Sequence, residues 1–473
     1  MPPIDWQPWH TAAFLEAQRR RRPVLLLLET AWAPACARVH AEVFARPDVA
    51  AAIAETTIAV RVDADRRPDI ADRYGLGQWP SLLVLTPEGH VLTGGTHLDD
   101  ALAARIRAAA RAFAEHDGRW TTGPPVESVP TELDQSAAVE AIAAAILTSR
   151  DPETGACMQA SGPSPGAALF ALAHATVRAD PGWAALAADT IDALADSDTA
   201  SALVAPFTVS AGSPIPAHTD LPGTAVGRLE DQAEWTRTLA RAVRLEPLPG
   251  WTRRLDRLVL GLRSTYLRDD FHWRPWTGAS GIVLVDASAR ACRALLAAAA
   301  ALDRPDLARD AIDALEVLAP TAYARGSGVA HVLQGGQARG PMLLDDAMLL
   351  GHALLDADAW RDGPVYRDLA EELLRTTLTR LQMASGALGD RVAALAGGGQ
   401  VGRLAEPCHP LIGNAAAASL LRRLFPDDIG QETEARRILQ AITTDAIAAG
   451  AAAAPVGLAW HALGPAGAVT AAW

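Results

Sequence analysis

The chain has 473 residues, of which half are apolar and 21% are charged, and its formal net charge at pH 7 is −13. This length predicts two or three domains, because single hydrophobic cores stop growing near about 250–300 residues. The composition is that of a folded protein, and the acidic balance opposes a phosphate backbone, so nucleic acid is excluded as an expected partner.

The residue types exclude further classes of chemistry. All 42 basic residues are arginine, so no lysine is present for Schiff-base catalysis. Cys36, Cys157, Cys292 and Cys408 are far apart in the sequence, which argues against a zinc site or a disulfide framework and fits a reducing cytoplasm. The start of the chain lacks a signal pattern, and the longest apolar runs are amphipathic or interrupted. We therefore expect a cytoplasmic protein with no membrane segment, no metal and no cofactor.

Residues 1–118 are predicted to form an α/β domain. Apolar runs or alternation indicate strands at 24–28, 57–62, 81–85 and 90–93. The turn Thr86-Pro87-Glu88-Gly89 predicts that the last two form an antiparallel hairpin, because proline fixes φ and glycine tolerates a positive φ. A helix over 99–115 closes the domain, and residues 119–130, rich in Gly, Thr and Pro, are predicted to be a linker.

From 131 to 473 the pattern changes to alanine- and leucine-rich segments at helical spacing. Twelve helices are predicted, starting near Asp134, Ser164, Pro181, Arg228, Trp251, Asp286, Arg304, Asp345, Val365, Leu411, Gln431 and Pro455. Twelve helices make six hairpins, and a closed ring gives every helix neighbours on both sides. The expected fold is an all-α (α/α)6 barrel, and an open solenoid of helical pairs is the alternative.

The segment Trp32-Ala33-Pro34-Ala35-Cys36 follows the first predicted strand. In a thioredoxin-like fold this place bears the reactive thiols, because a helix N-terminus lowers the pKa of a thiol there. Ala33 stands where the attacking sulfur belongs, so no disulfide can close within the motif. We interpret Cys36 as a packed apolar side chain, with a reactive monothiol as the alternative.

A second feature of the same domain is the pair Trp79-Pro80, directly before a predicted strand. Thioredoxin-like folds carry a cis-proline at this place, facing the active-site loop. An ordinary trans-proline at the start of a strand is the alternative.

Three segments, in order and nearly ungapped, carry a family resemblance: APACARVHAEVF from Ala33, RVDADRRPDI from Arg61 and QWPSLLVLTPEG from Gln78. They resemble the bacterial and animal family typified by spermatogenesis-associated protein 20. The resemblance implies a thioredoxin-like domain of unknown function followed by a six-hairpin glycosidase-like barrel. Members have two cysteines with histidines around them in the first segment, and this chain keeps only Cys36, so it resembles a degenerate, shortened member.

The resemblance continues at the starts of predicted inner helices, in RLEDQA from Arg228, VDASARA from Val285, LLDDAMLLGHALL from Leu343 and LIGNAAAASL from Leu411. The leading ends of inner helices converge on one mouth of a barrel, where ligands bind. The candidate ligand-binding residues are Trp79, Pro80, Glu230, Trp235, His272, Trp273, Asp345, Asp346 and Asn414. For any one Asp or Asn at a helix start, a simple N-cap is the competing interpretation.

Barrels of this shape act on carbohydrates through paired carboxylates or histidines. The candidate catalytic residues are Cys36, Asp231, Asp286 and His409. Two departures from the family weigh against catalysis: Ala287 and Ser288 replace a tryptophan and an asparagine, and an acidic insertion before Val285 is nearly absent.

Three hypotheses remain open from the sequence. The first is a barrel that binds a small polar ligand such as a sugar, with the first domain as a scaffold or protein-partner surface. The second is a sugar epimerase, isomerase or glycosidase acting in the barrel mouth. The third is a monothiol redox protein using Cys36.

Overall fold

The computed structural model describes residues 4–115, 133–159, 162–194, 227–361, 363–392 and 400–464. The chain divides into two compact units. The first comprises Met1–Glu127 and Arg391–Cys408, and the second comprises Ser128–Asp390 and His409–Trp473. The linker predicted at 119–130 lies outside the described residues.

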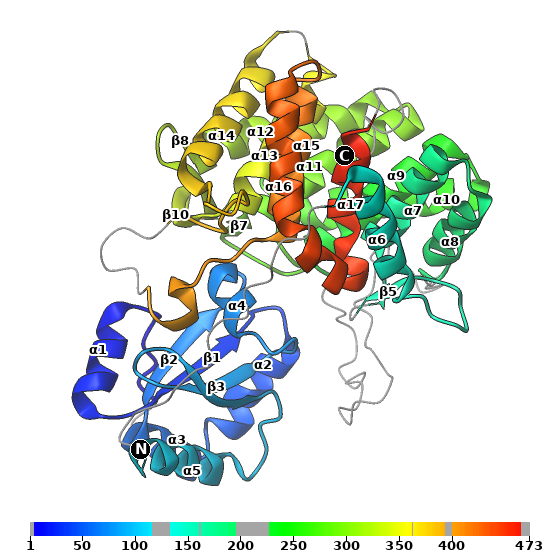
Figure 1. Ribbon diagram of the computed structural model, residues 1–473. Helices are drawn as coiled ribbons and strands as arrows, with labels where there is room; N and C mark the ends of the chain where they lie inside the picture. The colour runs from blue at the N-terminus through cyan, green and yellow to red at the C-terminus, as the bar shows by residue number, and fades with distance from the viewer. Residues whose placement is uncertain are drawn as a thin grey trace. The chain divides into compact units, whose positions relative to one another are not determined.

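The first unit has a thioredoxin-like α/β fold built on a four-stranded sheet of order β2-β1-β3-β4 (Figure 1). Strand β1 pairs in parallel with β2 and antiparallel with β3, and β3 and β4 form the hairpin that the turn at Gly89 predicts. The strands are β1 (Val24–Glu29), β2 (Ile58–Asp63), β3 (Ser81–Leu85) and β4 (Val91–Gly95). The helices are α1 (Thr11–Arg20), α2 (Pro34–Arg38), α3 (Pro47–Thr56), α4 (Pro68–Tyr74) and α5 (Leu102–Glu115), with a π-helical turn at Val39–Val43.

Strand β1 is buried along its whole length because both faces of the sheet are covered. Leu25 and Leu27 belong to one apolar cluster, with side chains from α3 and α5. Leu26 and Leu28 belong to a second cluster on the other face, with side chains from α1 and α4. The continuous apolar run in the sequence therefore reflects two cores that share one strand.

The second face of the sheet also includes Leu404, which is 1% exposed, and Val401 packs against it. Both residues lie in Arg391–Cys408, a segment inside the range predicted for the barrel, and the structure places it in the first unit instead. Polar contacts reinforce the packing: the hydroxyl of Tyr74 donates to the carbonyl of Gly89 at 2.8 Å and accepts from the amide of Arg403 at 2.9 Å. The predicted range of the barrel, 131–473, is therefore wrong for this segment. A short run of apolar residues does not indicate which of two distant cores it joins.

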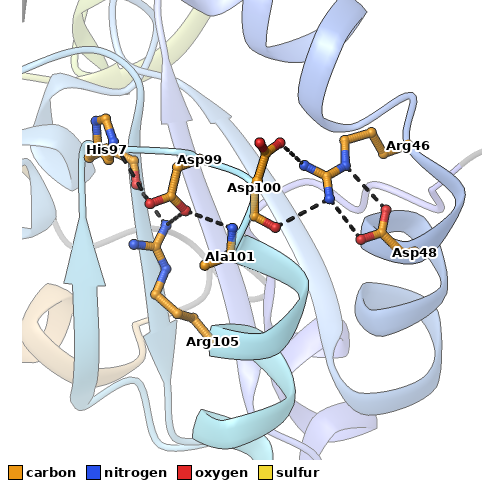
Figure 2. A network of polar contacts seen from close by, with 7 residues as sticks. All are labelled: Arg46, Asp48, His97, Asp99, Asp100, Ala101 and Arg105. Atoms are coloured by element: carbon orange, nitrogen blue, oxygen red, sulfur yellow. Dashed lines mark hydrogen bonds and ion pairs between the residues drawn. The ribbon is translucent and has the colours of Figure 1, made fainter.

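Exposed ion pairs surround the start of α5 (Figure 2). Arg46 bonds both Asp48 and Asp100, and Asp99 accepts from Arg105 at 3.0 Å and from the amide of Ala101 at 3.0 Å. Such exposed pairs contribute about 0–1 kcal/mol each, so we assign them to local loop geometry and not to a site.

The second unit is a closed (α/α)6 ring (Figure 1). Each inner helix packs against the next and α17 packs against α7, and this closure excludes the open solenoid. The inner helices are α7 (Pro165–Arg178), α9 (Leu229–Leu245), α11 (Val285–Leu302), α13 (Leu344–Asp358), α15 (Leu411–Leu424) and α17 (Ala454–Ala462). The outer helices are α6 (Gln135–Leu147), α8 (Pro181–Asp192), α10 (Pro249–Gly261), α12 (Pro305–Ala322), α14 (Val365–Leu381) and α16 (Ile429–Ala448). All twelve begin within two residues of the predicted starts. Within the part of the chain that is described, no helix combines the length and the apolar character needed to cross a bilayer.

A small sheet that the sequence patterns did not predict joins α11, α12 and α13. Its strands run in the order β10-β9-β7, with β8 beside β9. They are β7 (Ile282–Leu284), β8 (Tyr323–Ala324), β9 (Gly328–Gln334) and β10 (Gln337–Met342). Gly335 and Gly336 both have positive φ (58° and 72°), as a two-residue hairpin turn of the primed type requires. Since β7 leads directly into α11 and β10 leads almost directly into α13, this sheet brings β9 to the leading ends of two inner helices.

Candidate functional site

Two carboxylates and one histidine meet at the leading ends of α11 and α13. Asp346 is fully buried, and its Oδ1 accepts the backbone N–H of Asp286 at 3.0 Å. The Nδ1 of His331, from β9, lies 3.0 Å from each carboxylate oxygen of Asp346 and 4.0 Å from Oδ1 of Asp286. We call Asp286, His331 and Asp346 the α11–α13 cluster.

Burial sets the protonation of this cluster. It raises the pKa of Asp346 to about 6, against the opposing charge and hydrogen bond of His331. Oδ1 of Asp286 is buried and has no hydrogen-bond partner among the described residues. The cluster therefore keeps one buried acceptor without a donor among the described residues.

The same three side chains are also a candidate set of metal ligands. One ligand atom from each lies within 4.8 Å of the others. One imidazole nitrogen and two carboxylate oxygens suit a divalent cation. The hydrogen bonds between His331 and Asp346 already account for the contact between those two residues. The sequence-based expectation of no metal stays a prediction.

A second acidic group begins α9. Burial is the main cause that raises the pKa of Asp231 to about 6, the charge of Glu230 adds to it, and Arg228 opposes it. Glu230 forms an ion pair with Arg228. The carboxylates of α9 and α11 also share the cation of Arg290. Burial lowers the pKa of Arg290, but the negative charges of Glu234, Asp286 and Glu230 outweigh that effect and raise it. Arg290 thus connects the two acidic helix starts electrostatically.

Three of the predicted ligand-binding residues are used by the fold itself. The amide of Asn414 accepts from the backbone N–H of Leu388 at 2.7 Å and donates to the carbonyls of Leu388 and Pro410, both at 2.9 Å. Trp235 is 3% exposed and Trp273 is 1% exposed. A sugar platform must present an open ring face, so these two tryptophans are core residues, and Asn414 fixes the loop before α15. For these three, the structure corrects the prediction.

Three further predicted residues have different surroundings. Asp345 begins α13, and a Cβ placed on Gly413 would come within 2.3 Å of its Oδ1, so this carboxylate sits against the start of α15. His272 is partly exposed in the loop after α10, with Nδ1 3.1 Å from the carbonyl of Asp270. His409 precedes α15, and within the described chain its buried Nδ1 has no hydrogen-bond partner. No contact recorded in the described ranges joins His409 to Asp231 or Asp286, so we do not group it with them.

In the first unit, Cys36 lies in the short helix α2 and is 4% exposed. Burial raises the pKa of its thiol to about 11, a hydrogen bond with Thr30 lowers it, and the charge of Glu29 raises it further. At pH 7 the thiolate fraction is then on the order of 1 in 10,000, which opposes the monothiol hypothesis. The Trp79–Pro80 peptide bond is cis, as predicted, and Pro80 is buried while Trp79 packs partly against the core.

Cys36 is expected to react with iodoacetamide only after unfolding. In the native protein at pH 7.5, alkylation should label Cys408 first, because Cys408 is partly exposed whereas Cys36, Cys157 and Cys292 are buried. Peptide mass spectrometry after timed alkylation measures all four thiols in one experiment, so Cys408 is an internal control. Labelling of Cys36 at the rate of Cys408 would contradict its assignment as a packed residue.

The central residue missing from the sequence prediction is His331. Its sequence context, VAHVLQ followed by Gly335-Gly336, carries the signature of a two-residue hairpin, and that signal could have been recognised. The pairing of His331 with Asp346 could not have been predicted from the sequence, because it depends on where the hairpin packs.

Comparison with known proteins gives the family of the first unit. Residues 1–122 match the family described as "Protein of unknown function, DUF255" (Thioredox_DsbH). An uncharacterized protein of Caenorhabditis elegans is 33% identical over 103 residues, which cover 20% of this chain and 14% of that protein. Spermatogenesis-associated protein 20 of Homo sapiens is 29% identical over 103 residues, which cover 20% of this chain and 13% of the relative. The chain thus matches only a small part of these relatives' length.

Solved structures give the fold of the second unit. A D-mannose isomerase matches with a TM-score of 0.51 and 13% identity, covering 67% of this chain and 86% of that one. Cellobiose 2-epimerase from Bacillus thermoamylovorans matches with a TM-score of 0.51 and 10% identity over 66% and 86% of the two chains. A sugar epimerase from a ruminal bacterium matches with a TM-score of 0.53 and 10% identity, again over 66% of this chain and 86% of that one. At these identities the likeness establishes the six-hairpin fold and not the chemistry.

Proposed function

We propose that this chain, whose first 122 residues belong to the thioredoxin-like DUF255 family, binds a small carbohydrate in the acidic mouth of its helical ring. The observation that carries the proposal is the convergence of Asp286, His331 and Asp346 from three elements on one point. In this proposal the thioredoxin-like unit is a scaffold or protein-partner surface, because Ala33 removes dithiol chemistry.

The chemistry of the site suits sugar hydroxyl groups. A hydroxyl both donates and accepts, so it satisfies an unpaired carboxylate oxygen such as Oδ1 of Asp286 without bringing a second charge into a buried place. Ionised carboxylates form stronger hydrogen bonds with hydroxyls than neutral acceptors do. The similarity of the ring to sugar isomerase and epimerase folds supports the same ligand class by analogy.

The second candidate function is a sugar epimerase, isomerase or glycosidase at the same mouth. It is favoured by the raised pKa values of Asp231 and Asp346, both near 6, because a carboxyl group that keeps its proton near neutral pH is suited to act as a general acid. Asp286, which is partly exposed, would be the corresponding base. Turnover of a bound sugar distinguishes this candidate from binding alone.

Asp286→Asn is expected to weaken sugar binding at least tenfold, because it replaces one oxygen of an acceptor pair with a donor. Thermal shift with a panel of hexoses, uronic acids and disaccharides would find the ligand, and calorimetry would measure its affinity for both proteins. Asp427→Asn, at an exposed position of the same unit, is the matched control and should bind as the unaltered chain does. The idea is lost if no sugar in the panel binds, or if Asp286→Asn binds it with unchanged affinity. NMR of the bound sugar over hours would reveal epimerisation, isomerisation or hydrolysis.

A further inference from the structure

A cavity of about 300 Å³ is lined by the middle and C-terminal parts of inner helices α9 and α11, with residues from α13 and α15. Five arginines line it, namely Arg237, Arg241 and Arg244 of α9, Arg293 of α11 and Arg423 of α15. Helix α9 carries Asp231 in its first turn and Arg244 in its last, and its 17 residues span about 25 Å at 1.5 Å per residue. This arginine cavity is therefore separate from the acidic mouth.

The cations of the arginine cavity exceed the anions that face them. Asp356 is the one carboxylate among its described lining residues, and it accepts from Nε of Arg293 and from Nη2 of Arg423, both at 2.7 Å. Arg237 pairs with Glu234 at 3.3 Å. Among the described residues, Arg241 and Arg244 have no acidic partner. Five guanidinium groups thus face two carboxylates, which leaves about three positive charges without a counter-charge beside the cavity.

Buried donors point to the same conclusion. Arg293 is 2% exposed, and its Nη2 has no hydrogen-bond partner in the described part of the chain. Nε of Arg241 is likewise buried and unpartnered there. Buried guanidinium N–H groups are costly to leave without an acceptor, so their arrangement around one cavity favours the binding of an anion there.

The guanidinium of Arg423 is held in position by a neutral histidine. His352 is fully buried; its Nε2 lies 2.9 Å from the carbonyl of Ala416 and its Nδ1 lies 2.9 Å from Nη1 of Arg423. Because arginine can only donate, Nδ1 must be the acceptor and Nε2 must carry the proton. Together with the Asp356 contact, this fixes Arg423 before any ligand arrives, which is the arrangement expected of an anion-binding residue.

A purely structural role would explain only part of the set. Arginines in the last turns of helices compensate the helix dipole, which accounts for Arg244 and Arg423. It does not account for Arg293, which lies in the middle of α11, nor for the buried unpartnered donors. The remaining walls of the cavity are apolar, formed by Leu169, Leu296, Leu355, Trp360 and several alanines.

We propose that the arginine cavity binds a phosphate monoester, with the phosphate on the arginines and the organic part against the apolar wall. A dianion offsets most of the excess of about three positive charges, and guanidinium groups bind phosphate oxygens in a bidentate manner. The cavity volume fits a small metabolite.

The test uses phenyl phosphate and inorganic phosphate with the full chain. Phenyl phosphate should raise the melting temperature more than inorganic phosphate does, and sodium chloride at equal ionic strength should have little effect. Arg241→Gln should lower the affinity for phenyl phosphate at least tenfold in calorimetry, and without ligand it should melt at the same or a higher temperature, because it removes a cation from beside other cations. Arg257→Gln, at an exposed position of α10, is the control.

Either of two ligand-binding results would overturn the proposal: equal stabilisation by phenyl phosphate and chloride, or an unchanged affinity in Arg241→Gln. A lower melting temperature of unliganded Arg241→Gln would also count against it, since it would assign Arg241 a structural role. Asp286→Asn should bind phenyl phosphate normally, so this site can fail or succeed independently of the sugar site.

Discussion

Replacing Asp231 or Asp346 with Asn is expected to stabilise the protein by about 3 kcal/mol at pH 7.5 and to leave its stability nearly unchanged at pH 4. Burial raises the pKa of both carboxyl groups from 3.8 to about 6 in the folded state. The folded protein therefore binds these protons more tightly than the unfolded chain does. The stability linked to them is fully present below pH 3.8 and is lost as the pH rises through 6.

Urea denaturation between pH 4 and pH 8 measures this effect. The unaltered chain should lose stability across that range, whereas the Asn variants should lose less, so that the curves converge at acidic pH. In Asp346→Asn, an amide oxygen in the place of Oδ1 can still accept from His331 and from the backbone of Asp286. Asp427→Asn should follow the unaltered chain at every pH. A destabilised Asp231→Asn at pH 7.5 would mean that the carboxylate is favourably paired in the folded state.

Such a result would have a functional meaning. A protein that retains two carboxyl groups at a cost near neutral pH keeps them for a reason other than stability. The same two groups are those that the proposed site would use for a ligand or for proton transfer.

Leu404→Ala is expected to destabilise the thioredoxin-like unit by about 3 kcal/mol. Leu404 is 1% exposed in the core on one face of the sheet, although it lies more than 300 residues after that sheet in the sequence. Truncation would leave a cavity in the core that contains Leu26 and Leu28, because the hydrogen bond from the amide of Arg403 to the hydroxyl of Tyr74 restricts collapse of the segment around it. Hydrogen exchange measured by mass spectrometry should therefore show faster exchange in peptides covering β1 and β3.

The matched control for this prediction is Leu15→Ala, in α1 of the same unit, where the leucine is 57% exposed and its loss should change little. Equal hydrogen-exchange rates in the two variants would mean that Arg391–Cys408 does not contribute to the core of the first unit. A second variant, Asp69→Asn, tests the polar part of the same contact. Asp69 is buried, accepts two bonds from Arg67 at 2.8 and 2.9 Å, and lies 3.6 Å from Arg391.

Much of the fold is determined by local sequence. Asp134 and Ser164 mark helix starts because their side chains accept from amides three residues on, and those bonds need no distant partner. The apolar run at 24–28 forms a strand wherever both faces of its sheet are covered. The absence of a thiol at Ala33 follows from the residue type alone. These features could be predicted because the interactions that decide them lie within a few residues.

Tertiary structure decided the remaining features. Tertiary packing closed the ring, because closure requires contact between the first inner helix, α7, and the last, α17, which lie far apart in the sequence. It buried Trp235, Trp273 and Asn414, which look equally suited to a ligand when only their residue types are known. It brought His331 to Asp346, and it gathered arginines of α9, α11 and α15 around one cavity. Burial and the approach of charges depend on which distant elements pack together, and a single sequence carries no local signal for that.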